Sequence, residues 1–102
     1  MRKHILTFFF LLLSLLTQAQ VDNPIITHAY SADPSPRVFG DTLWVYPSHD
    51  KDDATSFSME DYHAYFTTDM MRWHDAGVIF SPFKQTTWAK SAAWAPDCIF
   101  RN

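Results

Sequence analysis

The sequence predicts an all-β fold, and within that class the first blade of a β-propeller followed by the start of the second blade. One observation is a run of about four short strand-like segments between Arg37 and Phe80, separated by turn residues. Another is a new strand-like stretch at 97–102, after an irregular connection. Because blades bury their faces against one another, one blade cannot close a ring. We therefore expect the 102 residues to be a fragment of a larger propeller.

The first expected element is a hairpin from Arg37 to Tyr46. Its sequence, "RVFGDTLWVY", places two runs of β-branched and aromatic residues on either side of a turn at Gly40 and Asp41. The following stretch, "PSHDKDDATSFSMED" at 47–61, is polar and lacks helical periodicity. We expect a long loop there.

Two further strands are expected after this loop. The segments "YHAYFTTD" (62–69) and "RWHDAGVIF" (72–80) have strand composition, with a turn at Met70 and Met71 between them and a bulge or bend at Gly77. Residues 81–96 should be irregular because two prolines interrupt them, and "DCIFRN" should begin a new strand.

The N-terminal residues 1–19 predict a secretory signal peptide. Arg2 and Lys3 precede an apolar run from Ile5 to Leu16, and small or polar residues follow as far as Ala19. A membrane anchor is the alternative, but the run falls short of the roughly 20 apolar residues that a spanning helix needs. We expect cleavage after Ala19, a mature domain at 20–102 and a secreted or periplasmic location.

Charge and cysteine content exclude several kinds of partner. The formal net charge is −3, and loss of Arg2 and Lys3 with the signal peptide makes it more negative. The remaining Lys and Arg residues are scattered, so nucleic acid is not an expected partner. No membrane span is expected, and the single cysteine, Cys98, allows no internal disulfide. A neutral ligand suits this charge distribution better than nucleic acid does. The sequence does not indicate the oligomeric state.

Four stretches in order resemble glycoside hydrolase family 43: "NPIITHAYSADPSP", "VFGDTLWVYPSHD", "YFTTDMMRWHDAGVIF" and "WAPDCIF". The family consists of secreted five-bladed β-propellers that include β-xylosidases, α-L-arabinofuranosidases and arabinanases. The resemblance covers nearly the whole mature chain. It implies a glycosidase that hydrolyses O-glycosyl bonds of arabinose- or xylose-containing plant polysaccharides or oligosaccharides with inversion.

Asp33 is the expected general base. In "SADPSP", prolines follow both Asp33 and Ser35 and disfavour helical geometry at these two residues. Taken alone, the Asp, Ser and Pro residues of this segment predict a surface turn. The resemblance instead places the base of the family's "ADP" segment on Asp33, and a base must be held in narrow geometry against its water.

Three residues are candidates for binding the carbohydrate substrate. Trp94 in "WAPD" resembles the tryptophan that lines the sugar subsite, with a place in the core as the alternative. His49 and Asp50 end a strand and could reach the pocket rim, with a solvated loop start as the alternative. Asp97 is expected to fix the loop at the blade boundary.

No metal site is expected from the spacing of His and acidic residues. His63 and His74 lack ligand spacing, and the acidic cluster at 50–53 lacks the calcium-loop pattern. No cofactor is expected, although the resemblance leaves room for a structural calcium ion in the longer parent.

The chain lacks the general acid that inversion requires. An acid and a base roughly 6.5–9.5 Å apart are needed, and the single glutamate, Glu60, lies in a segment unlike the family's acid segment. The acid and the family's second aspartate are expected outside this chain, so the fragment alone should be inactive. The alternatives are a non-catalytic carbohydrate-binding propeller, a truncated product without activity, and an unrelated small exported β-domain that binds a partner through its aromatic residues.

Overall fold

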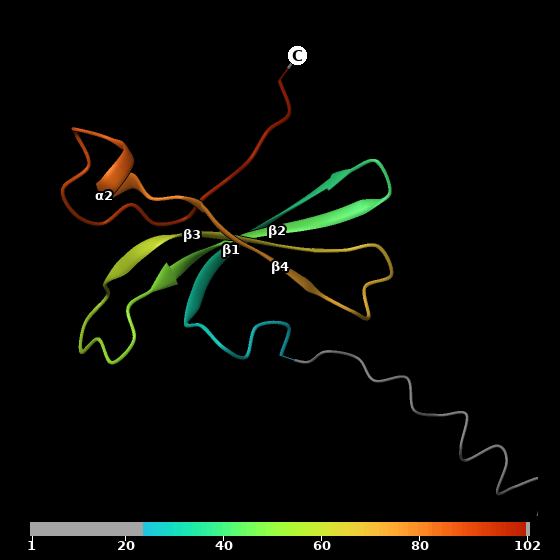
Figure 1. Cartoon of the computed structure of the whole chain (residues 1–102), viewed down its shortest axis with the longest axis horizontal. Coiled ribbons are helices and arrows are strands. Elements are labelled where there is room, and N and C mark those ends of the chain that lie inside the picture. Colours follow the sequence, from blue (N-terminus) through green and yellow to red (C-terminus); the bar gives the residue numbers. More distant parts are fainter. Residues whose placement is uncertain (1–23, 102) are drawn as a thin grey trace, which may run out of the picture.

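Four strands pair in chain order to form one twisted antiparallel sheet in the computed structural model, which describes residues 24–101 (Figure 1). Each strand pairs with the next along the chain, so the sheet order is β1-β2-β3-β4. The all-β prediction and the four-stranded meander are confirmed. The strands are β1 (Ser31–Phe39), β2 (Thr42–Asp50), β3 (Met59–Thr67) and β4 (His74–Phe80).

The two predicted turns are present. Gly40, at the β1–β2 turn, has a φ of 64°, a conformation that glycine adopts without a steric cost. Met70 has a φ of 60° in the β3–β4 turn, where its amide donates to the Thr67 hydroxyl at 2.9 Å. The predicted irregularity in β4 is confirmed too, because Gly77 has a φ of 80° beside a register shift between β3 and β4.

The first strand begins earlier than predicted, because "SADPSP" belongs to β1 and not to a turn. Ala32 pairs with Ser48 and Ser35 pairs with Tyr46, so Asp33 and Pro34 together lie opposite Pro47. Two residues against one is a β-bulge. Pro34 has no amide hydrogen to donate, so the interrupted ladder loses little there.

The loop expected at 47–61 is shorter than predicted. β2 continues through Asp50 and β3 begins at Met59, which leaves 51–58 as the connection. The polar composition was misleading because strand pairing supplies partners that composition does not reveal: Ser48 pairs with Tyr62 and His49 with Asp61.

The segment after β4 differs from the prediction in two places. A four-residue helix, α2 (Pro82–Gln85), begins with the proline that was expected to break the chain, since proline suits the first helical turn. Residues 97–101 form no strand. They extend from the sheet (Figure 1), and the Cys98 carbonyl accepts a hydrogen bond from the Arg37 side chain of β1, which is not a strand-ladder bond.

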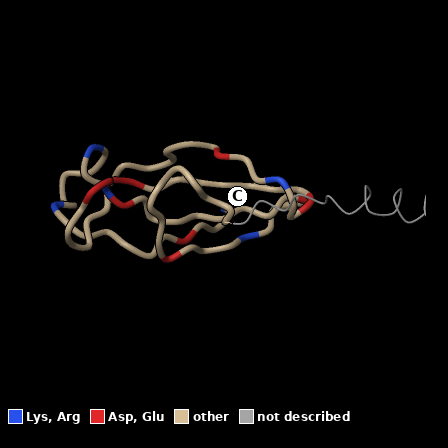
Figure 2. The backbone as a smooth tube through the Cα atoms, turned by 90° about the horizontal axis from the view of Figure 1, so that it is seen from below, with Lys and Arg blue, Asp and Glu red and all other residues tan. Residues whose placement is uncertain are grey.

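The core lies on the two central strands. The buried hydrophobic residues are Tyr46, Met59, Tyr62, Ala64, Tyr65 and Ala89, of which all but Ala89 belong to β2 or β3. The outer strand β4 leaves Val78, Ile79 and Phe80 exposed. Seen edge-on, the described chain is thin, and Lys and Arg lie toward both of its ends (Figure 2). Three lysines, Lys51, Lys84 and Lys90, line one cavity.

Within residues 24–101, no helix has the length and apolar character to cross a membrane. The predicted signal peptide at 1–19 and its cleavage site lie outside the described residues.

Candidate active site

Asp33 projects from the bulge of β1 and is exposed. On one side of the bulge, the Ser48 hydroxyl donates to the Ala32 carbonyl at 3.2 Å. On the other side, Ser35 and Tyr46 resume the regular pairing of β1 with β2. The aspartate therefore sits on a strand held at both sides, and this suits a group that must keep one position.

The backbone of Asp33 is left-handed, with a φ of 49°. This corrects the expectation of extended geometry before a proline, because the bulge fits one extra residue into β1 and forces Asp33 out of the strand conformation. Among the strand residues that the structure describes, Asp33 is the only non-glycine residue with a positive φ. Aspartate tolerates this region better than most residues, and such strain concentrates at functional sites.

Asp97 fastens the C-terminal segment to β1. Its carboxylate accepts a hydrogen bond from the Ser35 hydroxyl at 2.8 Å and forms an ion pair with the Arg37 guanidinium. The hydrogen bond from Ser35 is the main cause that holds the pKa of Asp97 below its usual value, and the Cys98 amide adds to it. This placement agrees with the structural role expected for Asp97.

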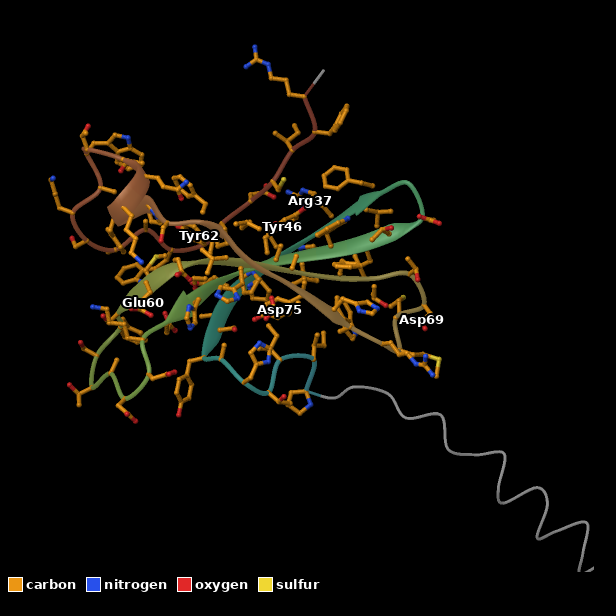
Figure 3. The ribbon with its side chains drawn as sticks, in the orientation of Figure 1. Arg37, Tyr46, Glu60, Tyr62, Asp69 and Asp75 are labelled. Atoms are coloured by element: carbon orange, nitrogen blue, oxygen red, sulfur yellow. The ribbon has the colours of Figure 1, made fainter. Side chains whose placement is uncertain are left out.

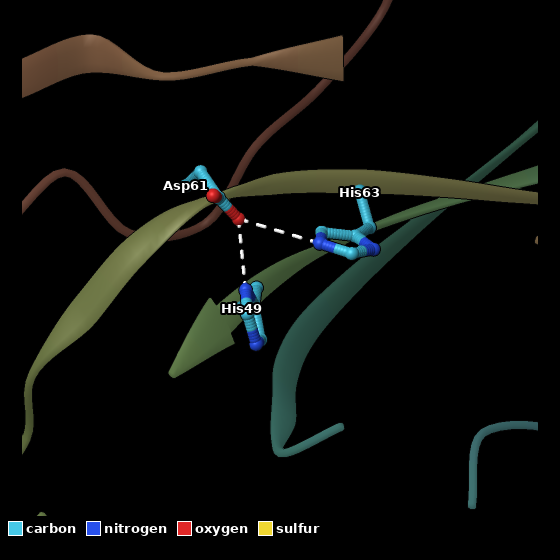
Figure 4. Close-up of side chains that lie close together, drawn as sticks. All are labelled: His49, Asp61 and His63. Atoms are coloured by element: carbon cyan, nitrogen blue, oxygen red, sulfur yellow. Dashed lines mark hydrogen bonds and ion pairs between the residues drawn. The ribbon is translucent and has the colours of Figure 1, made fainter. Parts of the chain in front are cut away.

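His49 and Asp61 face each other across β2 and β3 (Figure 4). His49 Nδ1 lies 2.8 Å from Asp61 Oδ1, and His63 Nε2 lies 3.4 Å from the same oxygen. The two imidazole rings meet edge-to-face with their centroids 4.6 Å apart. Asp61 was missed as a candidate, and His63 was set aside for lack of ligand spacing, although their separation of two residues places both on one face of a strand.

The same face continues toward β4 and the N-terminal segment. His63 Nδ1 lies 3.7 Å from Asp75 Oδ1, and Asp75 Oδ2 lies 2.8 Å from His28 Nε2. We call this alternating series of His49, Asp61, His63, Asp75 and His28 the His–Asp row. Burial raises the pKa of Asp75, but hydrogen bonds from the Gly77 amide and His28, with the charges of the two histidines, lower it overall. Figure 3 places Asp75 on the ribbon.

The other candidate residues lie in separate cavities. Trp94 is 46% exposed, so it is not a core residue of the described chain, and it lines a cavity of about 470 Å³ together with Glu60 and Lys90. Asp50 lines a second cavity, of about 280 Å³, with Tyr30. Asp33 is not among the lining residues of either cavity. His49 lines neither cavity, so the described residues do not gather the four candidates into one pocket.

Comparisons with known proteins agree on one group of enzymes. No protein-family model matches the chain. A xylosidase/arabinosidase 43A from Humicola insolens is 36% identical over 90 residues, which are 78% of this chain and 27% of that protein. A xylosidase/arabinosidase from Bacteroides ovatus is 35% identical over 72% of this chain and 25% of its own length. The crystal structure of a GH43_1 enzyme from Xanthomonas citri complexed with xylose matches with a TM-score of 0.69 and 39% identity, over 76% of this chain and 23% of the enzyme.

A four-stranded antiparallel unit with these likenesses is a blade of a propeller-type glycoside hydrolase. The chain spans about a quarter of the length of the relatives it matches. It belongs to glycoside hydrolase family 43 and corresponds to a fragment of one of the family's enzymes.

Proposed function

We propose that the complete protein carrying this chain is an inverting glycoside hydrolase that releases xylose or arabinose from plant polysaccharides or their oligosaccharides. The observation that carries the proposal is the exposed Asp33 on a strained bulge of β1. The names of the relatives support the substrate class, and the crystal structure complexed with xylose supports a sugar ligand.

In this proposal Asp33 acts as the general base. Its carboxylate removes a proton from a water molecule as that water attacks the anomeric carbon, on the face opposite to the leaving oxygen. A carboxylic acid on the other side protonates that leaving oxygen. We assign this acid to the protein outside residues 24–101, because Glu60, the single glutamate of the chain, lines the cavity of Trp94, which Asp33 does not line.

The sugar would contact Trp94, His49 and Asp50. The exposed face of Trp94 suits the C–H surface of a sugar ring, while His49 and Asp50 offer polar atoms to hydroxyl groups. In this chain Trp94 and Asp50 line different cavities, and His49 and Asp33 line neither of them. We infer that the rest of the propeller completes the pocket.

The test compares Asp33→Asn with Asp41→Asn in the complete gene product. Both substitutions remove one exposed carboxylate from the first hairpin, but Asp41 belongs to the β1–β2 turn. On aryl xyloside and arabinofuranoside substrates we expect Asp33→Asn to lower kcat by about 10²–10⁴-fold with little change in substrate binding, and Asp41→Asn to leave kcat unchanged. Near-normal turnover by a folded Asp33→Asn protein would contradict the proposal.

A non-catalytic carbohydrate-binding propeller is the second candidate, because Asp33 lines neither the cavity of Trp94 nor the cavity of Asp50. Binding of xylotriose without any release of xylose by the complete wild-type protein favours this alternative. Release of xylose with an inverted anomeric configuration in a proton NMR time course favours the hydrolase.

We also propose export to the periplasm or the outside of the cell. Arg2, Lys3 and the apolar run from Ile5 to Leu16 support this proposal. The N-terminus of the exported product, measured by mass spectrometry, should lie near Gln20. An exported product that retains Met1 would contradict cleavage.

A further inference from the structure

We propose that His49, Asp61 and His63 bind a divalent transition-metal ion of the zinc type between β2 and β3. This proposal does not depend on the proposed hydrolase activity. It rests on three ligand atoms from two strands that all lie within 4.8 Å of one another (Figure 4).

The spacing of the three ligand atoms suits a small tetrahedral ion. Zinc binds imidazole nitrogen and carboxylate oxygen at about 2.0–2.2 Å, so neighbouring ligand atoms lie about 3.3 Å apart around it. Asp61 Oδ1 is already 2.8 Å from His49 Nδ1 and 3.4 Å from His63 Nε2. A small rotation of either ring would open room for the ion.

His63 has an unused ligand atom at this position. Its Nε2 is buried and has no hydrogen-bond partner within residues 24–101, although it faces the Asp61 carboxylate. A buried polar atom without a partner costs free energy and calls for an explanation. A metal ion between His63 and Asp61 would bind this nitrogen and neutralise the carboxylate.

The surroundings of His63 favour the tautomer that a metal needs. Its Nδ1 lies 3.5 Å from the Tyr65 hydroxyl and 3.7 Å from Asp75 Oδ1. Asp75 is itself held by the Gly77 amide at 2.6 Å and by His28. Metal-binding histidines usually donate their other N–H to a carboxylate, and this leaves the facing nitrogen free to coordinate. At 3.7 Å, Asp75 Oδ1 lies just beyond hydrogen-bond distance, so a small shift toward His63 Nδ1 would let it accept that N–H.

The ligand types select the kind of metal. Two imidazoles and one carboxylate are typical of zinc and related transition ions, whereas calcium takes six to eight oxygen ligands. The side chains of His49, Asp61 and His63 are 18%, 12% and 13% exposed, so the ion would be largely shielded and its coordination would leave one position open.

A metal here would tie β2 to β3 close to the candidate base. His49 pairs with Ser31, two residues before Asp33. Binding to the folded chain raises stability by mass action, so the ion should raise the melting temperature of the protein.

The experiment uses the complete gene product after treatment with a chelator. Co²⁺ is added as a spectroscopic probe and its visible ligand-field absorption is followed; Zn²⁺ and Ca²⁺ are then titrated by calorimetry. We expect one Co²⁺ or Zn²⁺ per chain, a higher melting temperature with Zn²⁺, and no competition from Ca²⁺. Absence of stoichiometric Co²⁺ and Zn²⁺ binding overturns the proposal and leaves the His–Asp row as a hydrogen-bonded network.

Variants identify the ligands. His63→Gln and His49→Gln should each abolish stoichiometric binding, and Asp75→Asn should weaken it by about 10–100-fold. His74→Gln is the matched control, because His74 is an exposed histidine of β4 that stacks on Phe66 outside the His–Asp row. Circular dichroism checks that each variant folds, and His49→Gln serves if the more buried His63→Gln does not. Equal binding by the wild type and a folded His49→Gln protein would overturn the assignment.

Discussion

Asp97 and Arg37 form an ion pair between residues 60 positions apart, and it joins the C-terminal segment to β1. Ser35 adds a second hydrogen bond to the same carboxylate. Both partners of Asp97 follow Asp33 closely on β1, so the contact braces the strand that carries the candidate base. Arg37 lies beside the C-terminal segment in Figure 3.

The first prediction concerns this brace. Asp97→Asn should lower the melting temperature of the complete protein, because the neutral amide cannot form an ion pair with the Arg37 guanidinium. It should leave the shape of the pH–activity profile intact, because we assign Asp97 no role in proton transfer. Thermal unfolding and initial-rate measurements check both parts, with Asp41→Asn as the control. A well-folded Asp97→Asn protein that has lost all activity would contradict the assignment.

Acid should weaken the same contact. The pKa of Asp97 is held below the ordinary value of 3.8, so its ionised carboxylate stabilises the fold at pH values above 3.8. This stabilisation is lost as the pH falls through the lowered pKa of the folded protein. Between about pH 5 and pH 3, the wild type should therefore lose more thermal stability than Asp97→Asn. Parallel melting curves of the two proteins over this range would show that the carboxylate contributes nothing.

The β3–β4 turn depends on the buried Thr67 hydroxyl. It accepts hydrogen bonds from the Asp69 and Met70 amides and donates to Asp69 Oδ1. Thr67→Val keeps the shape but removes the acceptor, and it should lower the free energy of unfolding by about 1 kcal/mol, because water can reach these exposed turn residues. The neighbouring exposed Thr68→Val is the control. Urea titrations should separate the two variants, and equal midpoints would contradict this role.

The isolated domain at 20–102 should fold poorly by itself. β4 exposes Val78, Ile79 and Phe80, and in the part of the chain that the structure describes both outer strands have an unpaired edge. Circular dichroism and urea titration should show a broad, weakly cooperative transition, with association on size-exclusion chromatography. A cooperative transition together with a monomeric elution volume would contradict this expectation.

Local chemistry explains which parts of the fold were predictable. Gly40 and Met70 lie at turns that neighbouring residues specify, and the runs "TLWVY" and "HAYF" carry strand composition of their own. The start of β1 and the end of β2 were missed because they depend on partners far along the chain. No composition rule pairs Ala32 with Ser48.

The candidate site was predictable only in part. Asp33 and Trp94 were identified through resemblance, and their roles stay predictions. The His–Asp row was missed because its members come from three strands and the N-terminal segment, and only the register of the sheet brings them together. His49 opposite Asp61 is a consequence of pairing, and spacing along the sequence does not reveal it.

The bulge at Asp33 and Pro34 sets a rule for how this segment can evolve. Ala32 and Ser35 pair with Ser48 and Tyr46, which are two residues apart, so removing one residue between them would leave Ser31 opposite His49. The shortened strand would pair regularly, but it would lose the left-handed backbone on which Asp33 is displayed. Homologous proteins that use this aspartate should therefore conserve the length of the segment as strictly as the aspartate itself.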